Sequence, residues 1–292
     1  MRAFSERSAV GKRLSGRFVA GMSVAEALGA CEQLNREGMA VTLDSLGESV
    51  TEERQALASA AVYHELLHAI ETRGLDANVS VKLTQVGMDI DAGLAESVVG
   101  EMVEHAAAAD SFVRIDMEGS AYTEATIAMT ERLHARPGMR GRVGTVLQAY
   151  LYRTADDARR LVEQGIRVRL CKGAYKEPAE IAFPRKRDVD ENYVALMTYL
   201  AASGVFCGIA THDKAIVDAM RKFVRETGLP KRAFEFQMLY GIRRDLQREL
   251  IGEGFGVRVY LPFGAEWYPY FMRRLAERPA NVLFLAKNFF KS

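Results

Sequence analysis

The sequence predicts a single (βα)8 barrel over residues 39–292, preceded by a helical extension over residues 1–38 that we expect to cap the barrel. Eight short β-rich segments alternate with helical stretches, and eight such units over about 250 residues match the usual size of this fold. Several strand segments are nearly continuous apolar runs, as is typical of parallel strands covered on both faces. A doubly wound sheet is the alternative, but its phosphate turn is missing, because GEGFG (252–256) precedes a strand instead of following one.

The expected strands are MAVTLDSLG (39–47), NVSVKLTQVG (78–87), SFVRIDMEG (111–119), RVGTVLQAYL (142–151), GIRVRLCKGAY (165–175), VFCGIATHD (205–213), FEFQMLYG (234–241) and VRVYLPFG (257–264). Between them, apolar residues recur at a spacing near 3.6, which predicts helices. The helical stretches are 52–72, 93–109, 121–136, 155–164, 189–203, 213–227 and 242–253. Ser49 with Glu52 resembles a capping box that opens the first of these helices.

Composition excludes several classes of protein. With 39 Lys and Arg against 38 Asp and Glu in 292 residues, the near-neutral charge argues against a nucleic-acid surface. The three cysteines match neither a disulfide framework nor a zinc pattern, which favours a reducing, cytoplasmic compartment. No signal-peptide core opens the chain, and no apolar run of about 18 residues could span a bilayer. The C-terminal VLFLAKNFFKS (282–292) could end a core helix, contact a partner or contact a membrane surface.

Each predicted strand carries polar or charged residues within or just after its apolar run. In a barrel these positions meet at the carboxyl ends of the strands, where the active sites of this fold are found. Lys82, Asp116 and Arg169 lie inside apolar runs, so their burial requires partners. We therefore expect one polar site with residues drawn from Asp44, Glu48, Lys82, Asp116, Glu118, Gln148, Arg169, Lys172, Tyr175, Thr211, His212, Asp213, Glu235, Gln237 and Tyr260.

The segment YPYFMRRLAE (268–277) closely follows the last predicted strand and carries the adjacent arginines Arg273 and Arg274. Adjacent arginines point about 100° apart around a helix, so a solvated face rarely uses both together. Two guanidiniums that converge on one point form a strong carboxylate clamp, because each offers a planar fork of donors. Such pairs are more often surface pairs, and it is the position after the eighth strand that favours the clamp.

The sequence HELLH (64–68) reproduces the H-E-x-x-H spacing of zinc metalloproteases on a predicted helix. Two histidines at i and i+4 share a helix face, and the glutamate between them could act as a general base. In a barrel, however, this helix is the outer helix of the first unit and is remote from the strand ends. The other histidines, His105, His134 and His212, offer no obvious third ligand. We therefore expect two ordinary helix-surface histidines and no bound metal.

At the fifth predicted strand, RLCKGAY (169–175), the chain resembles the flavin-dependent proline dehydrogenases in their small monofunctional bacterial form. The resemblance covers residues 39–284, and the motifs of the fifth and eighth strands together make it highly specific. The matching motifs follow in order: TLDSLGE (42–48), VKLTQVG (81–87), RIDMEG (114–119), LQAYLYRT (147–154), RLCKGAY (169–175), ATHD (210–213), FEFQMLYG (234–241), YLPFG (260–264) and Y-x-x-R-R-x-x-E (270–277).

The resemblance implies a substrate site at matching positions. The residues that would hold the substrate carboxylate are Lys82, Arg273 and Arg274. The residues that would enclose its small ring are Leu170, Ala174, Tyr175, Tyr260 and Tyr270. Asp116 would orient polar neighbours beneath the ring. The resemblance thus assigns catalysis to Lys82, Asp116, Arg169 and Tyr260.

The resemblance also implies a flavin site. Arg169 would lie near flavin N5, with Glu48 as its ion-pair partner. The other cofactor contacts would come from Gln148, Cys171, Lys172, Gly173, Ala174, Thr211, His212, Gln237 and Glu277. Gln148 and Gln237 would bind the isoalloxazine or its chain, and Thr211 and His212 the ribose, pyrophosphate or adenine. Three positions depart from the family pattern and put details of adenosine binding in doubt: Cys171, Asp213 and Tyr240.

The reaction implied by the resemblance is oxidation of L-proline to 1-pyrroline-5-carboxylate, the first step of proline catabolism to glutamate. A hydride would pass to flavin N5, and the electrons would then pass to a quinone. Hydride transfer requires a neutral amine and a carbon held against N5, and a carboxylate clamp supplies that orientation. FAD is the expected cofactor, with FMN left open. The quinone leaves peripheral contact with the inner face of the membrane open, and the oligomeric state is also open.

Three other functions compete with this interpretation. A 4-hydroxyproline dehydrogenase is disfavoured, because Tyr260 would crowd a ring hydroxyl. A phosphate-binding aldolase or isomerase on the same fold could use Lys82 or Lys172 as a Schiff-base amine. A binding protein without catalysis would leave many cations of the site unpaired.

Overall fold

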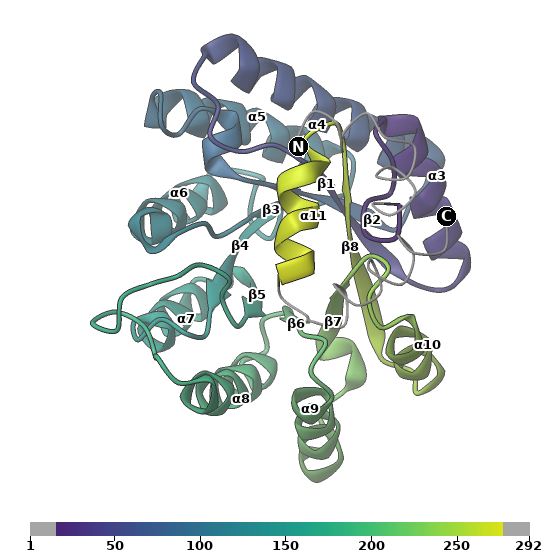
Figure 1. Cartoon of the computed structure of the whole chain (residues 1–292), viewed down its shortest axis with the longest axis vertical. Helices are drawn as coiled ribbons and strands as arrows, with labels where there is room; N and C mark the ends of the chain where they lie inside the picture. The colour runs from purple at the N-terminus through teal and green to yellow at the C-terminus, as the bar shows by residue number, and fades with distance from the viewer. Residues whose placement is uncertain (1–15, 277–292) are drawn as a thin grey trace, which may run out of the picture.

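The computed structural model describes residues 16–276, which form a closed barrel of eight parallel strands surrounded by helices (Figure 1). The strands pair in chain order and β1 also pairs with β8, so the barrel sheet has no open edge. The strands are β1 (Ala40–Ser45), β2 (Ala77–Val81), β3 (Val113–Ile115), β4 (Val143–Gln148), β5 (Arg167–Cys171), β6 (Cys207–Ala210), β7 (Phe234–Leu239) and β8 (Gly256–Phe263). The predicted fold class and all eight predicted strands are confirmed.

The helices between the strands are also where the apolar spacing predicts them. They are α4 (Glu53–Arg73), α5 (Ala92–Ala108), α6 (Thr123–Ala135), α7 (Thr154–Glu163), α8 (Lys186–Ala202), α9 (Lys214–Thr227) and α10 (Arg244–Gly252). The described residues also form three short 3₁₀ helices: η1 (Leu83–Val86), η2 (Ser120–Tyr122) and η3 (Lys231–Ala233). Within residues 16–276, no helix combines the length and apolar character needed to cross a bilayer.

The predicted capping box at the start of α4 is wrong. The N-cap is Glu52, and the Glu52 backbone N–H donates a hydrogen bond to Gln55 Oε1 at 3.3 Å. Ser49 lies too far upstream to cap this helix and has a left-handed backbone, with φ of 55°. Its N–H instead donates to Thr84 Oγ1 at 3.1 Å, which ties the segment between β1 and α4 to η1.

Residues 1–15 of the predicted N-terminal extension lie outside the described residues, and the described helix of this extension packs in the outer ring instead of capping the barrel. Helix α3 (Val24–Arg36) contacts β1, β8 and α4, and it lies in the outer ring between α10 and α4 (Figure 1). Its apolar residues Ala27, Leu28, Cys31 and Leu34 are buried in the main core. A helix with one apolar stripe is most stable with that stripe against the sheet, so α3 fills a place in the ring.

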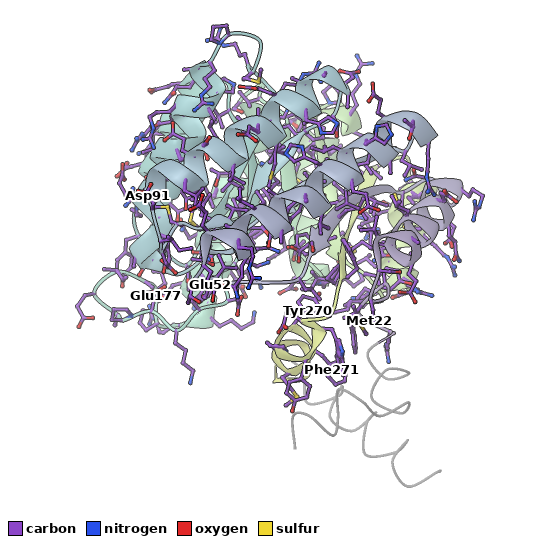
Figure 2. The ribbon with its side chains drawn as sticks, turned by 90° about the horizontal axis from the view of Figure 1, so that it is seen from above. Met22, Glu52, Asp91, Glu177, Tyr270 and Phe271 are labelled. Atoms are coloured by element: carbon purple, nitrogen blue, oxygen red, sulfur yellow. The ribbon has the colours of Figure 1, made fainter. Side chains whose placement is uncertain are left out.

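The helix that follows the barrel lies across its mouth. Helix α11 (Trp267–Ala276) follows β8 and crosses the centre of the ring in Figure 1. Figure 2 shows α11, with Tyr270 and Phe271, on the side of the molecule where Glu52 and Glu177 mark segments that follow strands. The apolar cluster that holds this helix consists of Phe18, Val19, Leu46, Trp267, Tyr270 and Phe271. The helix therefore covers the carboxyl ends of the strands.

The barrel interior is polar, whereas the layer between strands and helices is apolar. Successive strand residues face opposite sides of the sheet, so Val41 and Leu43 pack in the main core while Thr42 faces inward. Thr42 Oγ1 donates to Asn78 Oδ1 at 2.6 Å, and Arg258 Nε donates to Glu235 Oε1 at 2.7 Å. Buried polar groups require such partners, and the interior network continues upward to the mouth.

Candidate active site

A cavity of about 720 Å³ lies at the carboxyl ends of the strands and is bounded by α11. This volume suits a ligand larger than an amino acid, because small-molecule pockets commonly span about 300–1,000 Å³. The lining residues are Asp44, Lys82, Met117, Gln148, Cys171, Lys172, Gly173, Ala174, Tyr175, Ala210, Thr211, His212, Asp213, Lys214, Leu239, Tyr260 and Tyr270. The cavity is thus built from the ends of most strands, as expected for the active site of a barrel.

The structure brings most of the sequence-predicted residues to this cavity. Those that line it are Asp44, Lys82, Gln148, Cys171, Lys172, Gly173, Ala174, Tyr175, Thr211, His212, Asp213, Tyr260 and Tyr270. Asp116, Arg169 and Gln237 lie in the barrel interior and join the cavity through side-chain contacts. Leu170 does not line the cavity: it is fully buried in the main core. Because its neighbour Arg169 points into the barrel, Leu170 faces the helices and cannot enclose a ring in the cavity.

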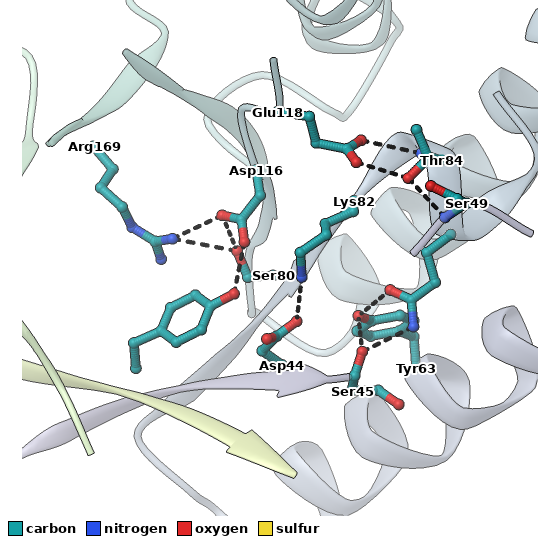
Figure 3. A network of polar contacts seen from close by, with 12 residues as sticks. Asp44, Ser45, Ser49, Tyr63, Ser80, Lys82, Thr84, Asp116, Glu118 and Arg169 are labelled. Atoms are coloured by element: carbon teal, nitrogen blue, oxygen red, sulfur yellow. Dashed lines mark hydrogen bonds and ion pairs between the residues drawn. The ribbon is translucent and has the colours of Figure 1, made fainter. Parts of the chain in front are cut away.

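Asp116 accepts three hydrogen bonds at the floor of the cavity (Figure 3). Its Oδ1 accepts from Ser80 Oγ at 2.6 Å and from Arg169 Nη1 at 2.8 Å, and its Oδ2 accepts from Tyr260 Oη at 2.7 Å. Burial, followed by the nearby carboxylates, raises the pKa of Tyr260 well above its usual range. Tyr260 is therefore a neutral hydrogen-bond donor with a fixed ring.

The acidic partner of Arg169 is Asp116, and the expected pairing with Glu48 is wrong. Asp116 lies on the interior side of the barrel, where the Arg169 side chain also points. Glu48 instead lies beyond the end of β1, in the segment that leads to α4. A buried guanidinium requires an anion close by, and the interior carboxylate supplies it.

Arg169 and Gln148 each keep one buried polar atom without a partner among the described residues. Arg169 Nε donates to Gln237 Oε1, and Gln237 Nε2 donates to Glu235 Oε1 at 2.7 Å, while Arg169 Nη2 has no acceptor. Gln148 Nε2 donates to the Glu118 carbonyl at 3.4 Å, while Gln148 Oε1 has no donor. Buried polar atoms are seldom left unsatisfied, so one free donor and one free acceptor indicate a polar ligand.

Gly208 on β6 makes room for this arrangement. A Cβ atom at residue 208 would lie 2.4 Å from Gln237 Nε2, closer than side chains can approach. A larger residue would therefore displace the Gln237 amide from its place between Arg169 and Glu235.

Lys82 and Asp44 form an ion pair in the cavity wall, with Lys82 Nζ 3.3 Å from Asp44 Oδ1 (Figure 3). Burial alone would lower the pKa of Lys82, but the carboxylates of Asp44, Asp116 and Glu48 outweigh it and raise the pKa. Lys82 therefore remains an ammonium ion at physiological pH. A Schiff-base role requires a neutral amine, so this pKa argues against Lys82 as the nucleophile of an aldolase.

Lys172 is also held by carboxylates. Its Nζ donates to Asp190 on α8 and, at 2.8 Å, to Asp213 Oδ2 at the start of α9. The hydrogen bond from Lys172 lowers the pKa of Asp213 below its usual range, so Asp213 is ionised. Lys172, which the resemblance assigns to cofactor binding, thus lies in the cavity wall, and two carboxylates neutralise its charge.

The turn after β5 depends on glycine. Gly173 has φ of 111°, and a Cβ atom there would lie 2.5 Å from the Tyr150 ring. The backbone of residues 172–174 therefore passes close to the cavity, and the Tyr150 N–H donates to the Lys172 carbonyl at 2.9 Å.

Beside this turn, burial raises the pKa of Cys171 to about 11, so its thiol is protonated and inert.

The proposed carboxylate clamp remains a prediction. Arg273 and Arg274 lie on α11, three and four residues after Tyr270, which lines the cavity. The structure does not describe the side chains of these two arginines. Glu277 and the C-terminal residues 282–292 lie outside the described residues.

Met117 and Leu239 line the cavity but were not predicted from the sequence, because apolar residues at strand ends cannot be distinguished from core residues. Asp44 was predicted as part of the polar site but was given no role of its own. Glu118 was also left without a role. It accepts from Thr84 Oγ1 at 2.7 Å and from Thr84 N–H at 3.1 Å, and so fixes η1 beside Lys82. Burial raises the pKa of Glu118.

The HELLH segment lies on α4, outside the barrel wall. His64 Nδ1 lies 3.0 Å from His105 Nδ1 of α5, and the two rings are 17° from parallel. This geometry fits one hydrogen bond in which one ring donates and the other accepts, and burial, together with His64, lowers the pKa of His105. The expected surface position holds for His68 but not for half-buried His64. No group of three His, Cys, Asp or Glu residues within residues 16–276 is placed to hold a metal.

Comparison with known proteins reveals relatives over nearly the whole chain. A family model described as proline dehydrogenase matches residues 27–287. Proline dehydrogenase 1 of Bacillus subtilis subsp. natto is 40% identical over 284 residues, which cover 97% of this chain and 93% of that protein. Proline dehydrogenase of Deinococcus radiodurans is 41% identical over 285 residues, which cover 95% of this chain and 90% of that protein.

A solved structure with the same fold is that of proline utilization A (PutA) from Bdellovibrio bacteriovorus, inactivated by N-propargylglycine. It matches with a TM-score of 0.84 and 25% sequence identity. The match covers 90% of this chain and 32% of that one, so the present chain spans about a third of the longer protein.

Proposed function

The chain belongs to the proline dehydrogenase family, whose reaction is the first step of proline catabolism, and we propose that it oxidises L-proline to 1-pyrroline-5-carboxylate with a bound flavin. The observation that carries the cofactor assignment is the pair of buried, unsatisfied polar atoms at the cavity floor, Gln148 Oε1 and Arg169 Nη2. A flavin ring presents both an N–H donor and nitrogen and oxygen acceptors, and so it can satisfy both atoms.

The residues around the cavity fit a flavin. Gln148 Oε1 would accept from the ring, Arg169 Nη2 would donate to it, and the backbone at Gly173 can approach closely because no side chain intervenes. The wall continues to Thr211 and His212 at the end of β6, which leaves room for the chain beyond the ring. When bound, the flavin would supply the acceptor for a hydride, which carries the two electrons of the oxidation. FAD is the proposed form, and FMN is the alternative that cofactor extraction tests.

The substrate site would lie between Lys82 and α11. The Lys82 ammonium, with Arg273 and Arg274 of α11, would bind the carboxylate of proline, and these three cations would fix the position of the carbon that loses hydride. Tyr260 would form one wall of the ring pocket, in a position fixed by its hydrogen bond to Asp116. A fixed Tyr260 ring leaves little space for a ring hydroxyl, which favours proline over 4-hydroxyproline.

Arg169 would stabilise the negative charge that a flavin gains on reduction. Its guanidinium is buried and lies over the Tyr260 ring, with 5.1 Å between Arg169 Cζ and the ring centre. A cation in this position acts at short range with little screening by water. Asp116 and Gln237 hold the guanidinium in one orientation, so it requires little rearrangement as the charge develops.

We assign the onward electrons to a quinone, which the family resemblance supports. We assign the protein to the cytoplasm, which the pattern of its three cysteines supports, and leave peripheral contact with the inner face of the membrane open.

An anaerobic absorption experiment tests the proposed function. The purified protein, reconstituted with FAD where needed, should show flavin absorption that L-proline bleaches, and 4-hydroxy-L-proline should bleach it more slowly. N-propargylglycine, which inactivated the Bdellovibrio protein, should prevent later reduction by proline. A protein that holds neither FAD nor FMN after reconstitution, or whose flavin stays oxidised with proline, would overturn the proposal.

A further inference from the structure

We infer that Asp44 is a positioning residue of the substrate site, which keeps the Lys82 side chain charged and directed into the cavity. The inference rests on the proposed function, in which the Lys82 ammonium binds the carboxylate of proline. Asp44 does not need to touch the substrate for this role, because it acts through Lys82.

The geometry places the two side chains together. Asp44 on β1 and Lys82 just after β2 both line the cavity, and their side chains reach toward each other in Figure 3. Asp44 is 1% exposed, and its Oδ1 lies 3.3 Å from Lys82 Nζ. A lysine side chain has a flexible four-carbon stem, so its direction depends on what holds the ammonium.

The other carboxylates near Lys82 are committed elsewhere or lie farther away. The charged groups of the described residues that face Lys82 are Asp44, Asp116, Glu48 and Glu118. Asp116 accepts from Ser80, Arg169 and Tyr260, and Glu118 accepts from Thr84. Within residues 16–276, Asp44 is the one carboxylate at ion-pair distance from Lys82.

Removal of the Asp44 charge should change the protonation of Lys82. A buried ammonium without an anion tends to lose its proton, since desolvation disfavours the charged form. Burial lowers the pKa of Lys82, and Asp44 is the largest of the carboxylate effects that raise it. In Asp44→Asn the desolvation effect should dominate, so Lys82 would become neutral as the pH rises and would bind a carboxylate less well.

Steady-state kinetics with L-proline can detect this effect. KM is measured across a range of pH for the wild type and for Asp44→Asn, and the KM of the variant is divided by the KM of the wild type. Ionisations that affect both proteins equally, such as that of the proline amine, cancel in this ratio. Above the new pKa of Lys82, the ratio should rise by about tenfold per pH unit. The ratio of kcat values should change less, because Asp44 acts on substrate binding. Asp157→Asn is the matched control: Asp157 on α7 is a buried carboxylate paired with Arg153, and neither residue lines the cavity.

A double-mutant cycle tests whether Asp44 acts through Lys82. Lys82→Met should itself raise KM, and adding Asp44→Asn should then change KM by less than about twofold, because the partner is already absent. Tyr260 also contributes to the titration of Asp44, so an effect routed through Tyr260 is the competing explanation. In that case Asp44→Asn would raise KM to the same extent with and without Lys82.

An NMR titration of the Lys82 ammonium in protein without substrate gives a second readout. The pKa of Lys82 should be lower in Asp44→Asn than in the wild type. A wild-type protein that does not oxidise proline would refute the proposed function but leave this titration interpretable. If Asp44→Asn does not fold, the Asp44→Asn/Lys82→Met protein should fold, because it contains no lone buried charge. An unchanged Lys82 pKa, a pH-independent KM ratio, additive KM effects or failure of both variants to fold would overturn the inference.

Discussion

Replacement of Arg169 by Met removes the cation at the floor of the cavity, and its effect on stability can be estimated from the structure. Arg169 is 6% exposed, and its Nη1 donates to Asp116 Oδ1 at 2.8 Å. Loss of one partner of a buried ion pair costs about 3–5 kcal/mol, because the remaining charge stays buried. Asp116 keeps its hydrogen bonds from Ser80 and Tyr260, so we expect about 3 kcal/mol, the lower end of that range.

The same substitution should lower the reduction potential of the bound flavin. One hydrogen bond from a charged group contributes about 1.5–3 kcal/mol. For a two-electron couple this corresponds to about 30–65 mV. Arg169→Met should therefore lower the potential by this amount and slow reduction by proline, with a smaller change in proline affinity, because Arg169 is not assigned to the carboxylate.

Chemical unfolding and equilibrium titration against redox dyes measure the two effects. Arg169→Met/Asp116→Asn should recover part of the lost stability, since neither partner then remains as a lone charge. Glu48→Gln should leave the potential close to that of the wild type, because Asp116 and not Glu48 pairs with Arg169. Wild-type stability and potential in Arg169→Met would refute the reasoning about this ion pair and about the cation beside the flavin.

Three further predictions concern α11, α4 and the thiol in the cavity. Arg273→Met or Arg274→Met should weaken proline binding by about 2–5 kcal/mol while flavin stays bound, and an unchanged KM and kcat in both variants would exclude the clamp. His64→Ala and His68→Ala should retain flavin and activity, whereas stoichiometric zinc lost in these variants would revive a metal site. Because burial raises the pKa of Cys171 from 9.0 to about 11, flavin-free protein at pH 8 should hold roughly 100-fold less thiolate than an ordinary cysteine. Labelling of Cys171 by iodoacetamide should accelerate as the pH approaches 11, and rapid labelling at pH 8 would contradict this.

The barrel could be predicted from the sequence because burial on both faces makes parallel strands apolar, and the spacing of the helices between them is equally regular. The place of α11 could not be predicted. Its apolar residues Trp267 and Phe271 suit either the outer ring or the mouth of the barrel. The choice depends on α3, which occupies the ring, and on Phe18 and Val19, which pack against α11. Contacts between residues far apart in the chain, such as Phe18 with Phe271, produce no periodic pattern in the sequence that could be used to predict them.

The candidate site was predictable as a set of strand-end residues, but the partners within it were not. Arg169 pairs with Asp116 and not with Glu48 because the Arg169 and Asp116 side chains point into the barrel at the same height along its axis. That height depends on how neighbouring strands are aligned with each other, which the sequence alone does not give. One error could have been avoided from the sequence alone. If Arg169 faces inward, strand alternation requires Leu170 to face the helices.

Single-turnover reduction with isotopically labelled substrate tests the central claim most directly. The claim is that this barrel binds a flavin and removes a hydride from the ring carbon of L-proline next to nitrogen, C5. Anaerobic mixing with L-proline should bleach the flavin and yield 1-pyrroline-5-carboxylate, and deuterium at C5 should slow the bleaching whereas deuterium at C2 should not. A flavin that stays oxidised, or that bleaches without forming this product, would contradict the account.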